Sequence, residues 1–290
     1  MERIFLSIAG FTICLISDEN FKVALEDGYL PFIMPDPSDQ PNIIINVKNG
    51  IPAELRNRQC QLFEAKNETQ KYFSIHQYEE YYKFIIYDQQ FENHIQQVAL
   101  LDKEYTNWVI YADPKPEDNK LYPLQYPLGP IILYYLTVKF DAIMIHASGI
   151  SDEGIGRVFT GFSGTGKSTM ADLWQKEGSE IINDDRLIIR CNGNKYVIYN
   201  TPMFYKDVPK KASLDSIYLI SHAKENIVNI IEGAAAITRI LAFCIQHNFN
   251  HNFIKHHLEF LEDFCKMIKV YEVGFTPDKS IVDLIKSLND

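Results

Sequence analysis

Residues 161–168 read Gly-Phe-Ser-Gly-Thr-Gly-Lys-Ser, which fits the Walker A pattern G-x-x-x-x-G-K-[ST]. In such a loop backbone N–H groups surround the phosphates of a nucleotide, and glycines supply the positive φ angles that this requires. Lys167 is expected to reach the β- and γ-phosphates, and the Ser168 hydroxyl to bind Mg²⁺. An ordinary glycine-rich turn is the alternative. The predicted nucleotide-binding residues are Gly161, Ser163, Gly164, Thr165, Gly166, Lys167, Ser168 and Thr169.

The residues on either side of the loop favour phosphate binding. Residues 156–160 form a short run that contains β-branched and aromatic residues, which is typical of a strand. Residues 169–176 are helix-compatible, with Met170, Leu173 and Trp174 at helical spacing. Gly178 then stands where glycine commonly ends a helix. The order strand, loop, helix directs the helix N-terminus at the bound anion.

An acidic pair follows the next apolar run. Residues 180–183 are expected to form a second strand that ends at Asp184 and Asp185. A phosphate site of this kind needs a carboxylate at the end of a neighbouring strand, where it holds Mg²⁺ and orders water. A solvated turn is the alternative for two adjacent acids. Because residues 186–190 continue in an extended pattern, the functional interpretation is favoured.

Three segments together resemble the catalytic half of HPr kinase/phosphorylase. They are His-Ala-Ser-Gly at residues 146–149, the loop at 161–169, and the aspartate pair at the family's spacing from the loop. The resemblance is strong over residues 140–190 and weaker toward the C-terminus. It implies an α/β fold containing a P-loop kinase domain, with Asp185 as the base that takes the proton of a substrate hydroxyl. It also implies that Asp184 and Ser168 hold the metal, that Lys167 holds phosphate, and that His146 lies near the γ-phosphate.

The loop is also similar to that of phosphoenolpyruvate carboxykinase, which shares this type of P-loop. A decarboxylating enzyme is disfavoured because the carboxykinase needs a far longer chain and its own Mn²⁺ and carboxylate-binding segments. The sequence departs from HPr kinase as well. No Glu-x-Arg-Gly segment follows Asp185, residues 199–202 read Tyr-Asn-Thr-Pro in the comparable region, and the C-terminal helix that grips the HPr protein is not recognisable.

These features predict in-line transfer of the γ-phosphoryl group from ATP, or another nucleoside triphosphate, to a hydroxyl with Mg²⁺ as cofactor. The expected acceptor is a serine of a protein or peptide, or a small molecule, rather than HPr. The alternative is a non-catalytic regulatory module that binds nucleotide by the same loop. No feature of the sequence indicates the oligomeric state.

Composition limits the other classes of function. The chain has 290 residues and a formal net charge of −10, which disfavours nucleic acid as a partner. No apolar run approaches the roughly 18 residues of a membrane span. Five scattered cysteines are expected to be reduced thiols in a cytoplasmic protein.

Two domains are predicted from the change in pattern along the chain. Residues 1–120 consist of short alternating runs separated by turns, which predicts a β-rich domain of unknown role. Residues 121–290 carry the kinase-like nucleotide-binding domain, with helices expected over 130–139, 232–247, 253–268 and 280–288. His247, His251, His256 and His257 lack the spacing of a closed metal site and are interpreted as surface polar residues.

Overall fold

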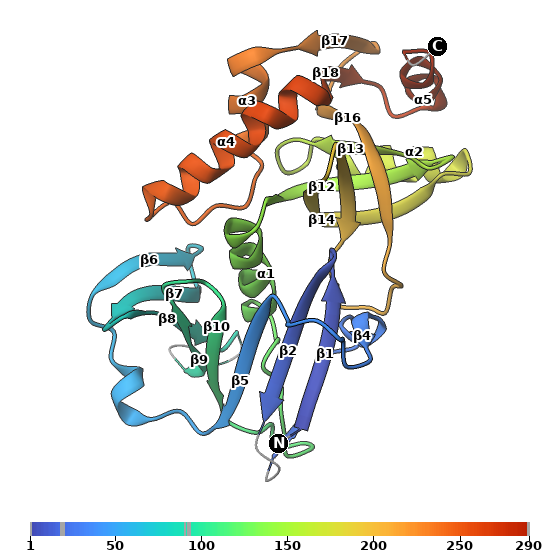
Figure 1. The fold of residues 1–290 in the computed structure, drawn as a ribbon. Helices are drawn as coiled ribbons and strands as arrows, with labels where there is room; N and C mark the ends of the chain where they lie inside the picture. The colour runs from blue at the N-terminus through green and yellow to red at the C-terminus, as the bar shows by residue number, and fades with distance from the viewer. Residues whose placement is uncertain (1, 18–20, 90, 92–93, 289–290) are drawn as a thin grey trace. The chain divides into compact units, whose positions relative to one another are not determined.

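The structure is a computed structural model that describes residues 2–17, 21–89, 91 and 94–288. The chain is a mixed α/β protein, as predicted, and divides into two compact units (Figure 1). Unit 1 comprises the chain up to Lys139 together with Pro202–Val208, and unit 2 comprises Phe140–Thr201 and the chain from Pro209 onward. The boundary predicted after residue 120 lies upstream of this division. No helix in the described parts of the chain is long and apolar enough to cross a membrane.

The larger sheet of unit 1 has the strand order β4-β1-β2-β5-β10-β9-β8-β7-β6. Neighbours are antiparallel, except that β5 runs parallel to both β2 and β10. The strands are β1 (Glu2–Ile8), β2 (Phe11–Ser17), β4 (Ile33–Met34), β5 (Ile43–Asn49), β6 (Gln61–Lys66), β7 (Lys71–Tyr78), β8 (Tyr81–Tyr87), β9 (Ile95–Asp102) and β10 (Asn107–Ala112). A separate parallel pair is formed by β3 (Lys22–Val23) and β11 (Lys120–Leu121), and short 3-10 helices span Leu30–Phe32 and Ala53–Arg56.

The first apolar run, residues 5–16, is divided between the two strands of a hairpin, β1 and β2. Ala9 and Gly10 have φ angles of 53° and 74°, which turns the chain back on itself. Ile8 and Phe11 are then directly paired. A turn that rests on a left-handed alanine has no clear signature in sequence, because glycine is the usual residue there.

The helix predicted from residue 130 is confirmed as α1 (Leu128–Lys139). It packs on the sheet of unit 1 through Tyr135, whose ring lies 5.2 Å from that of Phe84 and 5.8 Å from that of Trp108. The segment Pro202–Val208 also packs within unit 1, where the Phe204 ring lies 5.9 Å from the Tyr126 ring.

Unit 2 is built on a sheet of order β13-β12-β14-β15-β16-β18-β17. Because β13 also pairs with β16, the five strands from β12 to β16 close into a ring. The strands β13, β16 and β18 run parallel to one another. The bounds are β12 (Ala142–Asp152), β13 (Ile155–Thr160), β14 (Glu180–Asn192), β15 (Lys195–Asn200), β16 (Lys211–His222), β17 (Ile227–Ile231) and β18 (Lys269–Phe275).

Two pairs of helices cover different sides of this sheet. The alternation of side chains along β16 separates them, since Ile217 and Leu219 join the core that α3 and α4 cover, whereas Tyr218 and Ile220 join the core that α2 and α5 cover. The helices are α2 (Lys167–Lys176), α3 (Gly233–Leu241), α4 (His251–Met267) and α5 (Lys279–Lys286). All four were predicted in kind.

The helix α3 is shorter than predicted, since it was expected to continue to residue 247. After Leu241 the chain pairs with β12 instead, where the His146 N–H donates to Phe243 O at 3.0 Å and the Ile245 N–H donates to Met144 O at 2.8 Å. These bonds satisfy backbone groups of β12 that a longer helix would leave without partners.

Candidate functional site

The loop at residues 161–168 connects β13 to α2, so the predicted order of strand, loop and helix is confirmed. Gly164 and Gly166 have φ angles of 81° and 93°, which a side-chain-bearing residue adopts only with strain. Gly166 is the N-cap of α2 and no side chain caps this helix. The amides of the first turn are therefore available to an anion.

Close packing restricts two of the loop glycines further. A Cβ at Gly161 would lie 2.7 Å from the backbone oxygen of Ile220, and a Cβ at Gly166 would lie 2.9 Å from Cζ of Phe275. Both distances are shorter than real Cβ contacts. The predicted end of the helix is also confirmed, because α2 ends just before Gly178, whose φ is 95°.

Lys167 is the first residue of α2 and its ammonium group lies inside the loop. Nζ donates to Gly161 O at 3.0 Å and to Phe162 O at 3.1 Å. Burial lowers the pKa of Lys167, while the carboxylates of Asp184 and Asp185 act in the opposite direction. The loop lysine and the acidic pair therefore lie close enough to interact electrostatically.

The aspartates lie in the middle of a strand, so the prediction of a strand that ends at them was wrong. A single strand, β14, runs from Glu180 to Asn192. The reason is non-local, since β12 supplies partners to β14 along its length, from Ala142 opposite Arg190 to Ser151 opposite Glu180.

The register between β12 and β14 assembles the acidic part of the site. Ser148 is opposite Asp184, Ala147 is opposite Asp185, and His146 is opposite Arg186. The hydroxyl of Ser148 is buried and donates to Asp184 Oδ1. Residues 146–149 and the aspartate pair, two of the three segments that resemble HPr kinase/phosphorylase, are therefore adjacent in the sheet.

Both carboxylate oxygens of Asp185 have a partner. His146 Nδ1 lies 3.3 Å from Oδ1, and Arg186 Nε lies 2.8 Å from Oδ2. Burial alone would raise the pKa of Asp185, but the hydrogen bond from His146 and the nearby Arg186 guanidinium outweigh it and hold the pKa below its usual value. Asp185 is therefore ionised at neutral pH.

The other predicted nucleotide-binding residues line the loop with different exposure. Gly161 is buried, and Thr165 donates its hydroxyl to Phe162 O at 2.8 Å. The positions open to solvent are Ser163, Gly164, Ser168 and Thr169. Phe162 is 74% exposed, and its ring meets that of Phe243 edge-on at 5.2 Å.

Sequence reasoning assigned no role to Ser148 or Arg186, although both flank residues of the acidic site. Arg186 directly follows the aspartate pair, and an arginine at that place is a usable signal for a carboxylate partner. The pairing of Ser148 with Asp184 depends on strand register, which the sequence pattern alone does not specify here. The contact of Phe243 with the loop depends on the early end of α3. No feature of the sequence predicted that this helix would end at Leu241.

Among the described residues, which include the four clustered histidines, no three His, Cys, Asp or Glu side chains are arranged to hold an ion. Their interpretation as surface residues was wrong for His247 and His257, which are 5% and 1% exposed. The Nδ1 of His257 bonds Phe253 O at 2.7 Å. Burial lowers the pKa of both histidines.

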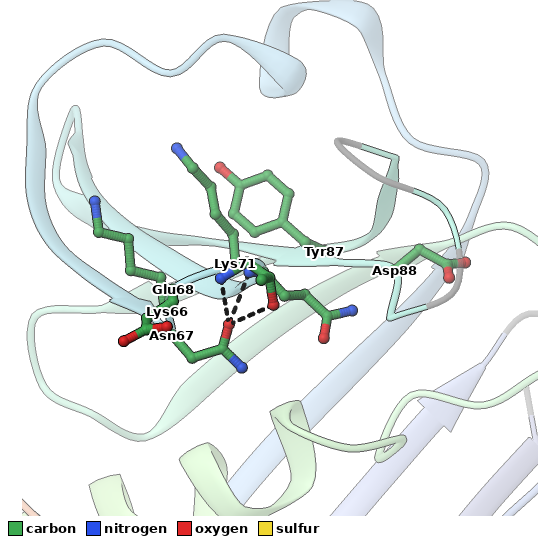
Figure 2. A pocket seen from close by; sticks show the side chains of 8 residues that line it. Lys66, Asn67, Glu68, Lys71, Tyr87 and Asp88 are labelled. Atoms are coloured by element: carbon green, nitrogen blue, oxygen red, sulfur yellow. Dashed lines mark hydrogen bonds between the residues drawn. The ribbon is translucent and has the colours of Figure 1, made fainter.

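Unit 1 contains a hollow of about 170 Å³ near the turn between β6 and β7 (Figure 2). Asn67 closes this turn by accepting hydrogen bonds from the backbone of Thr69 and Gln70 at 2.9 and 2.8 Å. Lys66 and Lys71, which line it, both pair with Glu64. Both lysines of the hollow are therefore paired with a carboxylate of β6.

No family model matches the chain. The HPr kinase/phosphorylase of Mycoplasmopsis pulmonis (strain UAB CTIP) is 27% identical over 124 residues, which are 43% of this chain and 37% of that protein. The match thus spans little more than a third of the relative's length. Among solved structures, the Hpr(Ser) kinase/phosphatase from Coxiella burnetii aligns with a TM-score of 0.30 and 10% identity, over 50% of this chain and 92% of that chain. The resemblance predicted from the loop and the aspartate pair is confirmed: this chain is similar to HPr kinase/phosphorylase.

Proposed function

We propose that unit 2 is a P-loop kinase domain of the HPr kinase and phosphoenolpyruvate carboxykinase type, and that it transfers the γ-phosphoryl group of ATP to a hydroxyl. The observation that carries the proposal is the proximity of Lys167 to Asp184 and Asp185: burial lowers the pKa of the lysine, and the two carboxylates are close enough to oppose that effect. A phosphate-binding lysine beside two acids is the combination that phosphoryl transfer requires.

The nucleotide phosphates occupy the loop. Lys167 then exchanges its bonds to Gly161 O and Phe162 O for the β- and γ-phosphate oxygens. The uncapped amides at the start of α2 and the positive end of the helix dipole add to the attraction. Catalysis rests mainly on this positioning and charge neutralisation.

The donor set beside the loop fits Mg²⁺. Ser168 and Asp184 are both exposed and offer a hydroxyl and a carboxylate, the hard oxygen ligands that Mg²⁺ prefers. The buried hydroxyl of Ser148 orients the Asp184 carboxylate. Bound there, the ion supplies positive charge to the phosphates and so offsets the charge that develops during transfer.

Asp185 is the base. The acceptor oxygen bonds to the γ-phosphorus, the bond from that phosphorus to the β–γ bridging oxygen breaks with its electrons going to ADP, and the hydroxyl proton passes to the Asp185 carboxylate. His146 and Arg186 hold that carboxylate by opposite oxygens at 3.3 and 2.8 Å. A base fixed in this way is aligned before the acceptor arrives.

The acceptor is a serine of a protein or peptide, or a small-molecule hydroxyl. Support comes from the departures from HPr kinase, since the Glu-x-Arg-Gly segment is missing after Asp185 and α5 (Lys279–Lys286) is only a short amphipathic helix. All five cysteines are free thiols, which agrees with a cytoplasmic protein.

The test is incubation of the full chain with γ-labelled ATP and Mg²⁺, with HPr or with an extract of peptides and metabolites as acceptor. The proposal expects label on a non-HPr acceptor with the wild type and none with Lys167→Ala. Efficient labelling of HPr on serine would contradict the acceptor class. Nucleotide binding without any labelling would favour a regulatory nucleotide-binding module instead.

A further inference from the structure

One side chain in contact with the loop has no role in the function proposed above. His222 is the last residue of β16, and Phe275 is the last residue of β18. These strands are parallel and the two residues are direct partners in the ladder. The ends of the two strands therefore present an imidazole and a phenyl ring together at one edge of the sheet.

His222 makes a directed contact with the loop. Its Nε2 lies 2.8 Å from Gly164 O. A carbonyl oxygen only accepts, so Nε2 carries the proton and donates it. Gly164 has a φ of 81° and is exposed, with no atom within 4 Å of where a Cβ would be. The bond from His222 therefore restrains the carbonyl of an exposed residue.

The bond sets the direction of an amide. A peptide group is planar and trans, so its C=O and the following N–H point in opposite directions. With Gly164 O turned toward His222, the Thr165 N–H of the same peptide group points away from the imidazole and donates to Phe162 O at 3.3 Å. The Gly164–Thr165 peptide group is thus fixed at both ends, by His222 at its oxygen and by Phe162 O at its N–H, and a phosphate-binding loop needs its peptide groups held in a fixed orientation.

Phe275 confines the imidazole. The His222 and Phe275 rings are stacked with centroids 6.2 Å apart and an interplanar angle of 24°. Phe275 is 1% exposed and its Cζ lies against Gly166. The same ring thus supports His222 and limits the second strained glycine of the loop.

We infer that His222 is a positioning residue for the triphosphate of the nucleotide. It preorganises the Gly164–Thr165 peptide group for binding, with Phe275 as its support. The inference rests on the proposed nucleotide binding by this loop. It predicts that loss of the imidazole N–H weakens nucleotide affinity and loosens the loop while the fold stays intact.

The experiment compares His222→Ala, His222→Gln and a control, His251→Ala, which alters an exposed histidine at the start of α4. The glutamine amide reproduces a donor near the position of Nε2. Calorimetry should show that His222→Ala raises the dissociation constant for Mg-ATP about five- to tenfold. The dissociation constants of His222→Gln and of His251→Ala should stay within about twofold of the wild-type value. Hydrogen exchange of the peptide covering residues 161–168, measured without nucleotide, should accelerate in His222→Ala only.

The outcomes separate the two proposals. A wild type that binds nucleotide while His222→Ala matches it in affinity and exchange would overturn the role of His222 and leave the proposed function standing. Equal weakening in the alanine and glutamine variants would overturn the role of the N–H donor. A wild type that binds no nucleotide would overturn the proposed function, and this inference with it.

Discussion

Ser148 and Asp184 are direct partners across the β12–β14 ladder, and the buried hydroxyl of Ser148 donates to the exposed carboxylate of Asp184. A group that is proposed to bind metal at the surface is thereby oriented from inside the sheet. Removal of such an outer partner commonly lowers metal affinity by about 10- to 100-fold.

Replacement of Ser148 by alanine should therefore raise the Mg²⁺ concentration needed for half-maximal nucleotide binding by about tenfold. Ser151→Ala in the same strand is the control, since Ser151 lies opposite Glu180 and not opposite the acidic pair. A titration of Mg²⁺ at fixed ATP measures the effect. Identical curves for the two variants would show that the Ser148 hydroxyl does not act on the metal.

Replacement of Lys167 by alanine should raise the dissociation constant for Mg-ATP by about 10- to 100-fold, because charge-assisted bonds to the phosphates are lost. Lys176→Ala, at the exposed end of the same helix, should bind as the wild type does. Calorimetric titration with circular dichroism as a check on the fold tests the prediction. Unchanged affinity in Lys167→Ala would remove the loop as the nucleotide site.

Replacement of Asp185 by asparagine should keep nucleotide binding and lower the rate of phosphoryl transfer by about two to four orders of magnitude. Asparagine fills the same space but cannot take the proton. Single-turnover transfer from labelled ATP measures the rate, with Asp172→Asn on the exposed face of α2 as control. Full turnover in Asp185→Asn would rule out the base and leave a structural role.

The two strained loop glycines allow backbone strain and steric conflict to be measured separately. Gly164→Ala introduces strain of about 1–2 kcal/mol at positive φ, with open space around the new Cβ. Gly166→Ala adds a contact of 2.9 Å with the buried Phe275 ring. Urea unfolding should therefore show a larger loss of stability for Gly166→Ala, and equal losses would contradict the close packing.

Stability should fall as the pH is lowered from about 6.5, because buried histidines are held neutral. The pKa of His247 is lowered by burial from 6.5 to about 3, so between these values the unfolded chain binds a proton that the folded chain does not. Acid then favours unfolding, with a slope of about 1.4 kcal/mol per pH unit for this one group. His76 and His257, whose pKa values are also lowered mainly by burial, act in the same direction.

The variant His247→Leu should have a shallower dependence of unfolding free energy on pH between about 6.5 and 4. Urea unfolding at several pH values measures it, with the exposed His251→Leu as the matched control. A slope unchanged from the wild type in His247→Leu would show that His247 is not the titrating group.

The parts of the site that follow from local sequence could be predicted. The loop needs glycine at Gly164 and Gly166 because their φ angles are positive, and α2 buries Met170 and Trp174 at the spacing read from the chain. Gly178 ends that helix as expected. In each case neighbours in sequence supply the physical cause.

The remainder depends on partners far away in the chain. The continuation of β14 through Asp184 and Asp185 requires the ladder with β12, and the position of Phe275 requires β18 to pair with β16. The burial of His257 is predictable from the sequence, because His257 shares the apolar face of α4 with Phe253 and Phe260 at helical spacing.

The assignment of Pro202–Val208 to unit 1 has a consequence for how the protein can be made. This heptapeptide is encoded between β15 and β16, yet its Met203 backbone fits against Gly28 so closely that a Cβ there would lie 1.7 Å from the carbonyl oxygen. Unit 1 therefore includes a segment that follows its last helix only after a long stretch of unit 2, and neither unit is one uninterrupted stretch of the chain. A fragment designed to contain unit 1 alone should therefore include Pro202–Val208 joined to the chain that ends at Lys139. A fragment of unit 2 should join Thr201 directly to Pro209, or use a circularly permuted order.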